Sequence, residues 1–533
     1  MDPSHRTTAF GPSAMAIAAV SIALFSPGCG SGLGEGIPQF PGGPTAPLTA
    51  EEVRGIITQA AAALSNDTMV IAVVDREGNL LGVFRKTNAP AMVKALLAGQ
   101  LRDVDAVEFA VSLARTGAFF SNDQAPLSSR TVRFISREHF PPTFGPDGRV
   151  TGVRNTPSGA LWNIEGTNRG CSLSNDFLPG QEISAARSID RTSPGLGIAT
   201  VPGGIPLFKL GRLVGGVGVC GVAPAAAEFA AINGTAGFGP NVAPPGVIFI
   251  DGVRLPFVEQ TARPVGTGSV RFENVTDVGV FVSIPDLQNP NQMIADVQSS
   301  LRSNVPEGWL VGPKGGAELS EAEVRTIIQN CVARANRTRA AIRLPLEERT
   351  KMVIAVTALD GEVLGLFRMP DATVFSIDVA VSKARNVVYF SGFDRRVLDL
   401  PGVPFGTAVT NRTLRFGSQP FFPAGIDDSL PGPFVPLLLN NFANPCTQGF
   451  SEPAAPNQSG IVFFPGSAPL YKLGFLLVGG LGVSGDGVDQ DDYVTAGGLL
   501  GYEAHASIRA DQISVRGVRL PYLKFPREPE GGR

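Results

Sequence analysis

Four carboxylates within seven residues form the densest group of side chains that could do chemistry. They are Asp486, Asp489, Asp491 and Asp492, and they follow an apolar segment near the C-terminus. Oxygen ligands at this density can hold a hard cation, but the spacing is not that of an EF-hand loop and the distal glutamate is missing. The alternative is a strand-to-helix junction, where the carboxylates cap a helix and complement its dipole. We favour the junction.

Arginines recur at matching positions in two parts of the chain. Arg85 and Arg368 each end an apolar segment, and the segments 130–134 and 412–416 share the pattern R-T-x-R-F. Guanidinium groups suit the recognition of carboxylates, including the propionates of haem. The repetition fits structural ion pairs equally well. Arg85 and Arg368 are therefore candidate ligand-binding residues, with both interpretations open.

Histidine use limits the chemistry further. Of His5, His139 and His505, none recurs between the two parts, so haem ligation by imidazole is not built into the repeat. His139, at the entrance to a loop, is the candidate axial ligand, and the alternative is a surface histidine. The chain has no G-x-S-x-G, H-E-x-x-H or C-x-x-C motif, so no recognised catalytic or zinc-ribbon chemistry is indicated.

The cysteines fall into two groups. Cys220 and Cys331 lie in apolar segments, and we expect both to be buried small residues. Cys171 and Cys446 occupy equivalent insertions, and in an exported protein they could pair as a disulfide. Equivalence by symmetry does not by itself bring two Cα atoms to the roughly 6 Å that a disulfide requires.

The N-terminus has the composition of an export signal. An apolar run at 14–25 is too short to span a bilayer and suits the central region of a signal peptide. Cys29 follows it, which leaves open a lipoprotein signal with an acylated Cys29 or a plain secretory signal. We expect a periplasmic protein, an outer-membrane lipoprotein or a secreted protein, in contact with a membrane only through a lipid anchor. The net charge of −3 indicates no nucleic-acid partner.

Two diverged copies of one domain position these side chains. Five sequence blocks recur in the same order, which chance does not explain. The blocks are 69–89, 109–115, 130–134, 206–221 and 252–257 in the first copy, and 352–372, 379–385, 412–416, 469–485 and 517–522 in the second. We expect an export signal at 1–29, a Gly/Pro-rich linker at 30–48, copies at 49–262 and 319–533, and a connector with some strand at 263–318.

Each copy predicts an α+β domain with a mainly antiparallel sheet. Capping boxes that begin at Thr49 and Ser320 each open an apolar-periodic helix. A strand–turn–strand unit follows, then a longer helix, a long insertion (135–202 or 417–466) and a second hairpin. The long helix carries an acid and an arginine seven residues apart, and we expect that face to be solvated or at an interface. In the connector, the segment 269–275 alternates like a strand and the segment 278–282 is an apolar run.

The pattern G-x-G-x-x-G occurs at 216–221 and 480–485. A dinucleotide site needs these glycines between a strand and a helix, with an acid about 20 residues further on. Here the glycines lie inside the strand of a hairpin, where glycine marks the close approach of another backbone or of a ligand. We favour close packing.

Several segments together resemble the GlcG/HbpS-type domain family. They are IAVVDREGNLLGVFR (71–85), AVSKAR (380–385), PGGIP (202–206), and GVSG (482–485) followed by Gln490 and Asp491. That family includes extracellular haem-binding sensor components, glycolate-operon accessory proteins and the C-terminal domain of a corrinoid adenosyltransferase. The resemblance covers both copies without the insertions and the connector. It implies a profilin-like domain, with a central antiparallel sheet and helices on its faces.

The two copies have lost complementary parts of the family pattern. The first keeps Gly203, Gly204 and Pro206, and the second keeps Ser484, Gly485, Gln490 and Asp491. We hypothesise that the copies form one pseudo-symmetric pair with a single composite or specialised pocket near the glycine-rich hairpins. The expected function is that of an exported small-molecule-binding protein, whose ligand is haem or another carboxylate-bearing molecule. A haem-degrading or small-acid-processing enzyme, and a structural or interaction module of the cell envelope, remain as alternatives.

Overall fold

The computed structural model describes residues 46–97, 100–144, 150–165, 167, 169, 188–190, 195–240, 248–250, 252–289, 291–300, 305–450 and 459–530. All the described residues belong to one compact unit, Phe40–Arg533, and the fold below is that of this unit. The expected export signal with Cys29 lies outside the described residues. In the described part, no helix combines the length and apolar character needed to cross a membrane.

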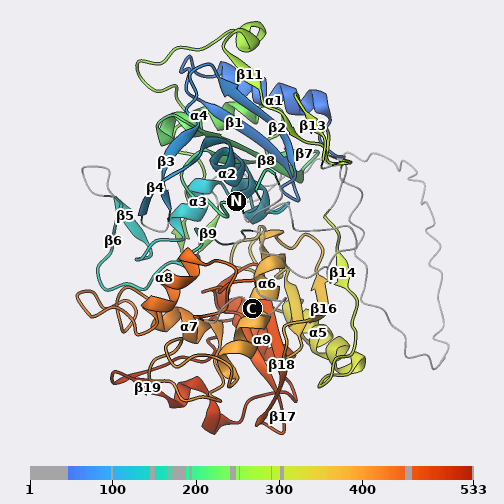
Figure 1. The fold of residues 1–533 in the computed structure, drawn as a ribbon, viewed down its shortest axis with the longest axis vertical. Coiled ribbons are helices and arrows are strands. Elements are labelled where there is room, and N and C mark those ends of the chain that lie inside the picture. Colours follow the sequence, from blue (N-terminus) through green and yellow to red (C-terminus); the bar gives the residue numbers. More distant parts are fainter. Residues whose placement is uncertain are drawn as a thin grey trace, which may run out of the picture. The chain divides into compact units, whose positions relative to one another are not determined.

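A five-stranded antiparallel sheet forms the centre of the first copy, in the order β11-β2-β1-β8-β7 (Figure 1). Its strands are β1 (Val70–Asp75), β2 (Leu80–Lys86), β7 (Gly204–Lys209), β8 (Arg212–Cys220) and β11 (Gly279–Phe281). Helices α1 (Ala50–Ala62) and α4 (Pro224–Gly234) pack together on one face, and α2 (Ala106–Phe120) packs on the other. Ile71 of the central strand faces Phe84 on one side and Val219 on the other.

The second copy repeats this sheet, in the order β14-β16-β15-β18-β17. Its strands are β14 (Gly308–Val311), β15 (Val353–Thr357), β16 (Val363–Arg368), β17 (Ser467–Lys472) and β18 (Leu476–Ser484). Helices α5 (Glu321–Ala335) and α9 (Val488–Gly498) contact each other on one face, and α6 (Phe375–Ser391) packs against β15, β17 and β18. The expected α+β class, with helices on a mainly antiparallel sheet, is confirmed in both copies.

The connector supplies the edge strand of each sheet. Strand β11 pairs with β2 in the first copy, and β14 pairs with β16 in the second. The strand expected at 269–275 is wrong, because η3 (Phe272–Asp277) is a 3₁₀ helix. The apolar run at 278–282 does contain β11. A short ribbon, β12 (Ile284–Pro285) with β13 (Met293–Ile294), lies between the two edge strands in sequence.

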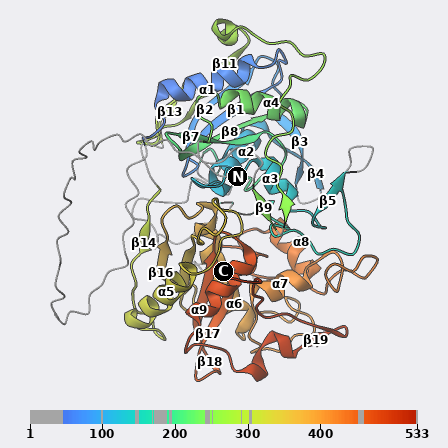
Figure 2. The ribbon, with the colours of Figure 1, turned by 180° about the vertical axis from the view of Figure 1, so that it is seen from behind.

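The remaining elements are short helices and short strands outside the two five-stranded sheets. The R-T-x-R-F segments form short helices, α3 (Ser129–Phe134) and α7 (Asn411–Gly417). A hairpin of β3 (Met92–Leu97) and β4 (Gln100–Asp105) precedes α2 and is visible from both sides (Figures 1 and 2). The others are β5 (Pro142–Phe144), β6 (Val150–Gly152), β9 (Phe249–Ile250), β10 (Val253–Arg254), α8 (Val435–Ala443), η4 (Ala506–Ile508), η5 (Ala510–Gln512), β19 (Ser514–Val515) and β20 (Val518–Arg519).

Local sequence signals explain where the main elements begin and turn. Both expected capping boxes are present, since Thr49 and Ser320 each accept the amide of the glutamate three residues on. The second hairpin of the first copy turns at Leu210 and Gly211, whose φ angles of 52° and 79° suit a tight two-residue turn. The expected elements of each copy are thus confirmed.

The glycines of β8 and β18 let the central helix lie directly on the sheet. A Cβ atom at Gly216 would collide with the carbonyl oxygen of Ala114, and one at Gly218 with that of Ala110. In the second copy, Gly480 and Gly482 meet the backbone of α6 in the same way. The close-packing interpretation of G-x-G-x-x-G is therefore confirmed.

Of the two expectations for the acid-and-arginine face of the central helix, the solvated one is wrong. Arg115 and Arg385 are buried, and their Nε atoms donate to the carbonyl oxygens of Gly78 at 3.0 Å and Gly361 at 2.9 Å. Each arginine therefore holds the turn of the first hairpin against the helix. Asp378 is also buried, and burial raises the pKa of its carboxyl to about 7 against the attraction of Arg385.

Candidate functional site

The carboxylates of the 486–492 run form ion pairs and do not cap a helix. The run does lie at a strand-to-helix junction, between β18 and α9, with Asp489 and Asp491 in the first turn of α9 as expected for carboxylates that complement the helix dipole. The N-cap is Gly487, without a side-chain hydrogen bond, so only the capping part of the interpretation is wrong. Asp489 and Asp492 pair with Arg412 and Asp486 pairs with Arg343. Within the described ranges, no group of acids, histidines and cysteines is arranged to hold a metal ion.

The repeated arginines have structural partners in both copies. Arg368 is fully buried and donates to the carbonyl oxygens of Ala372 and Val305, while Arg85 donates to that of Ala89 at 2.8 Å. Both side chains thus tie the end of a strand to the loop after it. Of the two interpretations left open for Arg85 and Arg368, the geometry supports the structural one and not ligand binding.

The R-T-x-R-F arginines also pair in the same way in both copies. Arg130 forms two hydrogen bonds with Glu228, of 2.6 and 2.9 Å, and Arg412 pairs with Asp492. Since Glu228 and Asp492 occupy matching positions at the start of α4 and α9, the ion pair is a feature of the repeated domain. It joins the short helix to the helix that follows the second hairpin.

A cavity of about 500 Å³ brings together four of the predicted ligand-binding residues. They are Ser484, Gly485, Gln490 and Asp491, all from the turn between β18 and α9. The first copy contributes apolar side chains to the same cavity, namely Phe120, Leu127, Ile135, Leu161 and Ile250. The cavity is therefore lined by residues of both copies.

The other predicted ligand residues do not line this cavity. Gly203 and Gly204 lie close to backbone, since Cβ atoms there would collide with the carbonyl oxygens of Val219 and Leu113. Pro206 lies within β7, opposite Gly216. The G-G-x-P element of the first copy thus serves close packing in this structure.

A buried ion pair lies at the floor of the cavity, and only one of its partners, Asp491, was predicted from the sequence. Lys383 Nζ donates to Asp491 Oδ2 at 2.9 Å and to the carbonyl oxygen of Val483 at 2.7 Å. Burial lowers the pKa of Lys383, although Asp491 opposes this, and burial raises the pKa of Asp491 to about 7 against the attraction of Lys383. The first copy has Leu113 and Ala227 at these positions. The joint replacement of an apolar pair in the first copy by a lysine and an aspartate in the second was the sequence signal that could have revealed this ion pair.

Hydroxyl groups continue the polar floor beside the ion pair. Ser484 Oγ donates to Ser376 Oγ at 3.1 Å, and Ser376 Oγ lies 2.7 Å from Thr373 Oγ1. Ser484 and Thr373 both line the cavity. A ligand in the cavity therefore meets hydroxyls and a glycine turn on one side and apolar side chains of the first copy on the other.

The mouth of the cavity carries cations from the second copy. Arg339, Lys524 and Arg527 are all lining residues, together with Phe525, which is half exposed. Lys524 forms an ion pair with Asp489 at 2.9 Å. In the part of the chain that the structure describes, the side chains of Arg339 and Arg527 have no hydrogen bond or ion pair. These two guanidinium groups remain available to an anionic ligand.

Neither described histidine lines this cavity. His139 lines a different cavity, of about 430 Å³, where its Nδ1 lies 3.0 Å from the carbonyl oxygen of Thr156 and its Nε2 lies 3.5 Å from Asp427. His505 stacks on Phe475 with ring centroids 4.6 Å apart. The suggestion of His139 as an axial ligand finds no support in the geometry of the composite cavity.

The cysteines follow the expected division as far as the described residues extend. Cys220 and Cys331 are free and buried, and burial raises the pKa of the Cys220 thiol to about 12. Cys446 is disulfide-bonded. Cys171 lies outside the described residues, so its pairing with Cys446 stays a prediction.

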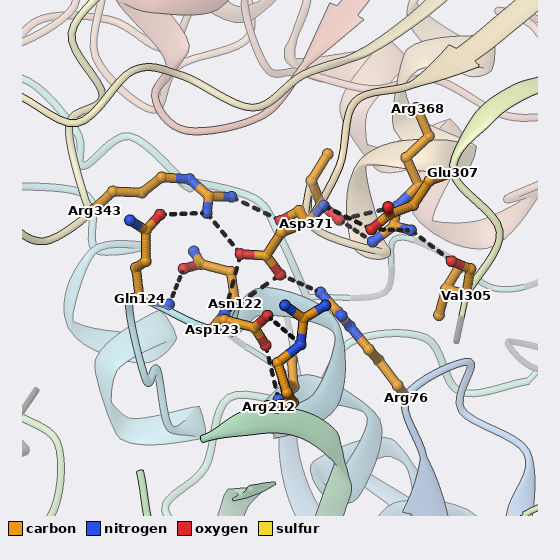
Figure 3. A network of polar contacts seen from close by, with 12 residues as sticks. Arg76, Asn122, Asp123, Gln124, Arg212, Val305, Glu307, Arg343, Arg368 and Asp371 are labelled. Carbon is orange, nitrogen blue, oxygen red and sulfur yellow. Dashed lines mark hydrogen bonds and ion pairs between the residues drawn. The ribbon is translucent and has the colours of Figure 1, made fainter. Parts of the chain in front are cut away.

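A network of charged groups joins the two copies beside the cavity (Figure 3). Asp371 of the second copy accepts from Arg76 of the first at 2.6 Å and from Arg343 at 2.8 Å. Arg343 also donates to Asp486 and, at 3.0 Å, to Gln124 of the first copy. Because Arg343 follows the lining residue Ile342 in sequence, the network holds one wall of the cavity against the first copy.

We expect the network to weaken in acid, because its ion pairs need an ionised Asp371 and acid protonates that carboxylate. Burial raises the pKa of Asp371, but Arg76 and Arg343 outweigh it and hold the pKa at about 2, below the ordinary 3.8. A lowered pKa stabilises the fold above pH 3.8 by roughly 2 kcal/mol, and this contribution is lost as the pH falls through 3.8 towards 2. The difference in unfolding free energy between wild type and Asp371→Asn should therefore narrow by about 2 kcal/mol between pH 6 and pH 2.

Urea titrations at several pH values measure that difference. Asp103→Asn is the matched control, because Asp103 forms an exposed ion pair with Lys94 and should show little narrowing. A constant difference for Asp371→Asn across the pH range would contradict the assignment of an ionised Asp371.

Comparison with known proteins assigns a family to the second copy. Residues 319–499 match the model of the family described as "Haem degrading protein HbpS-like". These residues form an HbpS-like domain. The resemblance stated from the sequence is thus confirmed for the second copy, and the match leaves the first copy outside it. No curated protein matches the chain.

Solved structures are similar to about a third of the chain. A PduOC:haem complex is 21% identical, with a TM-score of 0.22, over 36% of this chain and 98% of that one. Klebsiella pneumoniae protein ORFY is 18% identical, with a TM-score of 0.22, over 34% and 87%. A double mutant of Streptomyces reticuli HbpS is 16% identical, with a TM-score of 0.21, over 35% and 88%.

The HbpS-like domain contains the polar floor of the cavity. Lys383, Ser484, Gly485, Gln490 and Asp491 all fall within 319–499. Of the cations at the mouth, Arg339 lies within the matched segment and Lys524 and Arg527 follow it, while the first copy supplies an apolar wall. The cavity therefore combines polar residues of the HbpS-like domain with apolar residues of the first copy.

Proposed function

We propose that the protein binds a small, largely apolar molecule with an anionic group in the cavity between its two copies. The observation that carries this proposal is the composite cavity of about 500 Å³, with a polar floor, apolar walls and a cationic mouth. Its size lies within the roughly 300–1,000 Å³ that is typical of small-molecule sites. The two copies differ where this floor is built, so one specialised site per chain is the simplest arrangement.

Haem is the first ligand to test. The family that matches the second copy is described as haem-degrading, and haem is a flat apolar molecule with two carboxylates. The cavity offers apolar walls for the ring and guanidinium groups for the carboxylates. Haem binding is the proposal for this chain, and haem degradation is the enzymatic alternative.

Filling the cavity tests the proposal with residues from both copies. Ala160 of the first copy and Ala341 of the second both line the cavity. We expect Ala160→Trp and Ala341→Trp each to weaken haemin binding at least tenfold, since a bulky ring occupies the space of the ligand. Titration with haemin, followed by the shift of its Soret band, measures the dissociation constants.

The control is Ala333→Trp, at an exposed position on α5 outside the cavity. It should bind haemin as wild type does. Equal affinity for all four proteins would place any binding elsewhere and defeat the proposal. Loss of the Soret band over time in the wild-type sample would favour the enzymatic alternative.

A further inference from the structure

We infer that the cations at the mouth of the cavity bind the carboxylates of the ligand and that the apolar walls pack against its ring, without coordination of a metal. A metal-free porphyrin therefore binds as well as haem does. This inference rests on the proposed function and narrows its ligand to flat apolar carboxylates. Three sets of lining residues carry it: the cations at the mouth, the aromatic walls, and the side chains available to hold iron.

The lining of the cavity has more cationic than acidic side chains, which favours an anionic ligand. Lys383 is paired with Asp491 and Lys524 with Asp489, which uses the two acids among the described lining residues. Arg339 and Arg527 lie beyond these pairs, in a chain whose formal net charge is −3. Arginine binds carboxylate through two parallel hydrogen bonds, so two arginines match a ligand with two carboxylates.

The walls suit a flat aromatic ring. Phe120, Phe375, Phe464 and Phe525 all line the cavity. The rings of Phe120 and Phe375 lie 4.3 Å apart across the boundary between the copies, and those of Phe375 and Phe464 lie 6.0 Å apart. Stacked and edge-on contacts with such rings stabilise an aromatic ligand beyond the burial of its surface.

The same cavity lacks the side chains that hold haem iron in proteins. Haem iron is bound through histidine, cysteine, methionine or tyrosine. None of these residue types occurs among the described lining residues. Lys383 already donates to Asp491 and Val483, and its side chain is fully buried at the floor of the cavity. The residues present therefore fit the carboxylates and the ring of haem, but they do not fit its iron.

Three porphyrins separate the contributions of the metal and the carboxylates. We expect the full-length protein to bind protoporphyrin IX with a dissociation constant within about threefold of that for haemin. Protoporphyrin IX dimethyl ester, whose carboxylates are blocked, should bind at least tenfold more weakly because it loses the charge-assisted hydrogen bonds. Porphyrin fluorescence, and quenching of protein fluorescence for haemin, give the three constants.

Variants at the mouth assign the binding to the two arginines. Arg339→Gln and Arg527→Gln should each weaken protoporphyrin IX about tenfold and leave the dimethyl ester unchanged. Arg337→Gln is the control, because Arg337 is exposed two residues away and does not line the cavity. If haemin binds and protoporphyrin IX binds a hundredfold more weakly, the inference is overturned and the proposed function stands. If neither binds, both fail.

Discussion

Replacing Arg343 with methionine is expected to lower the free energy of unfolding by about 3–5 kcal/mol. The side chains of Arg343 and Asp486 are both fully buried. Removing one partner of a buried ion pair leaves the other charge without compensation, which costs about this amount. Asp486 would keep the amide of Lys351, at 2.7 Å, as a donor, and Asp371 would keep Arg76.

Urea denaturation of the full-length protein measures the loss. Arg325→Met is the matched control, because Arg325 pairs with Glu321 at 2.9 Å on an exposed helix surface. Such an i,i+4 pair contributes about 0.3–0.5 kcal/mol, so the control should change stability by no more than that. A loss for Arg343→Met of under 1 kcal/mol would show that the network is not a major stabilising element.

The position of Arg343 links this stability to ligand binding. Asp486 lies between two lining residues, Gly485 and Gly487, and Arg343 follows the lining residue Ile342. Arg343 also contacts Gln124 of the first copy, which brings the apolar wall to the polar floor. A loosened network should therefore disturb the cavity before the sheets themselves unfold, because neither sheet depends on these contacts for its strand pairing.

The repeated elements could be predicted because their signals are local. The capping boxes at Thr49 and Ser320, the strand–turn–strand unit and the second hairpin each depend on neighbours a few residues away. The packing glycines could be predicted too, since glycine inside a strand indicates close approach of another backbone. The 3₁₀ helix at Phe272–Asp277 was wrongly predicted as a strand, because alternating apolar residues also occur in short irregular segments.

The site could be predicted only in part, because its walls come from distant segments. The turn of the second copy, with Ser484 to Asp491, was identified from the family pattern. Arg85 and Arg368 look the same in sequence whether they face a ligand or a nearby carbonyl oxygen, and the structure places them against carbonyl oxygens. The apolar wall from Phe120 could not be found, since nothing local indicates which surface of the first copy meets the second.

The ion pair at the floor of the cavity offers the second large effect, because the chain itself contains an apolar version of it. Lys383 and Asp491 correspond to Leu113 and Ala227 in the first copy, and all four side chains are buried. Gly466 and Gly203 lie against the two pairs in the same way. Lys383→Leu alone should cost about 3–5 kcal/mol, since it leaves Asp491 buried without its cation, and Asp491→Ala alone should cost a similar amount.

The double variant Lys383→Leu with Asp491→Ala should cost clearly less than the sum of the two single variants. It installs the combination that the first copy already accommodates, and apolar replacement of a complete buried ion pair is often close to neutral. A double-mutant cycle measured by urea denaturation should give a coupling of about 2 kcal/mol or more. Additive losses would mean that the pair acts through other neighbours, such as Val483. If stability is restored while porphyrin affinity falls, the second copy retains the pair for its cavity, since the first copy shows that the fold does not require it.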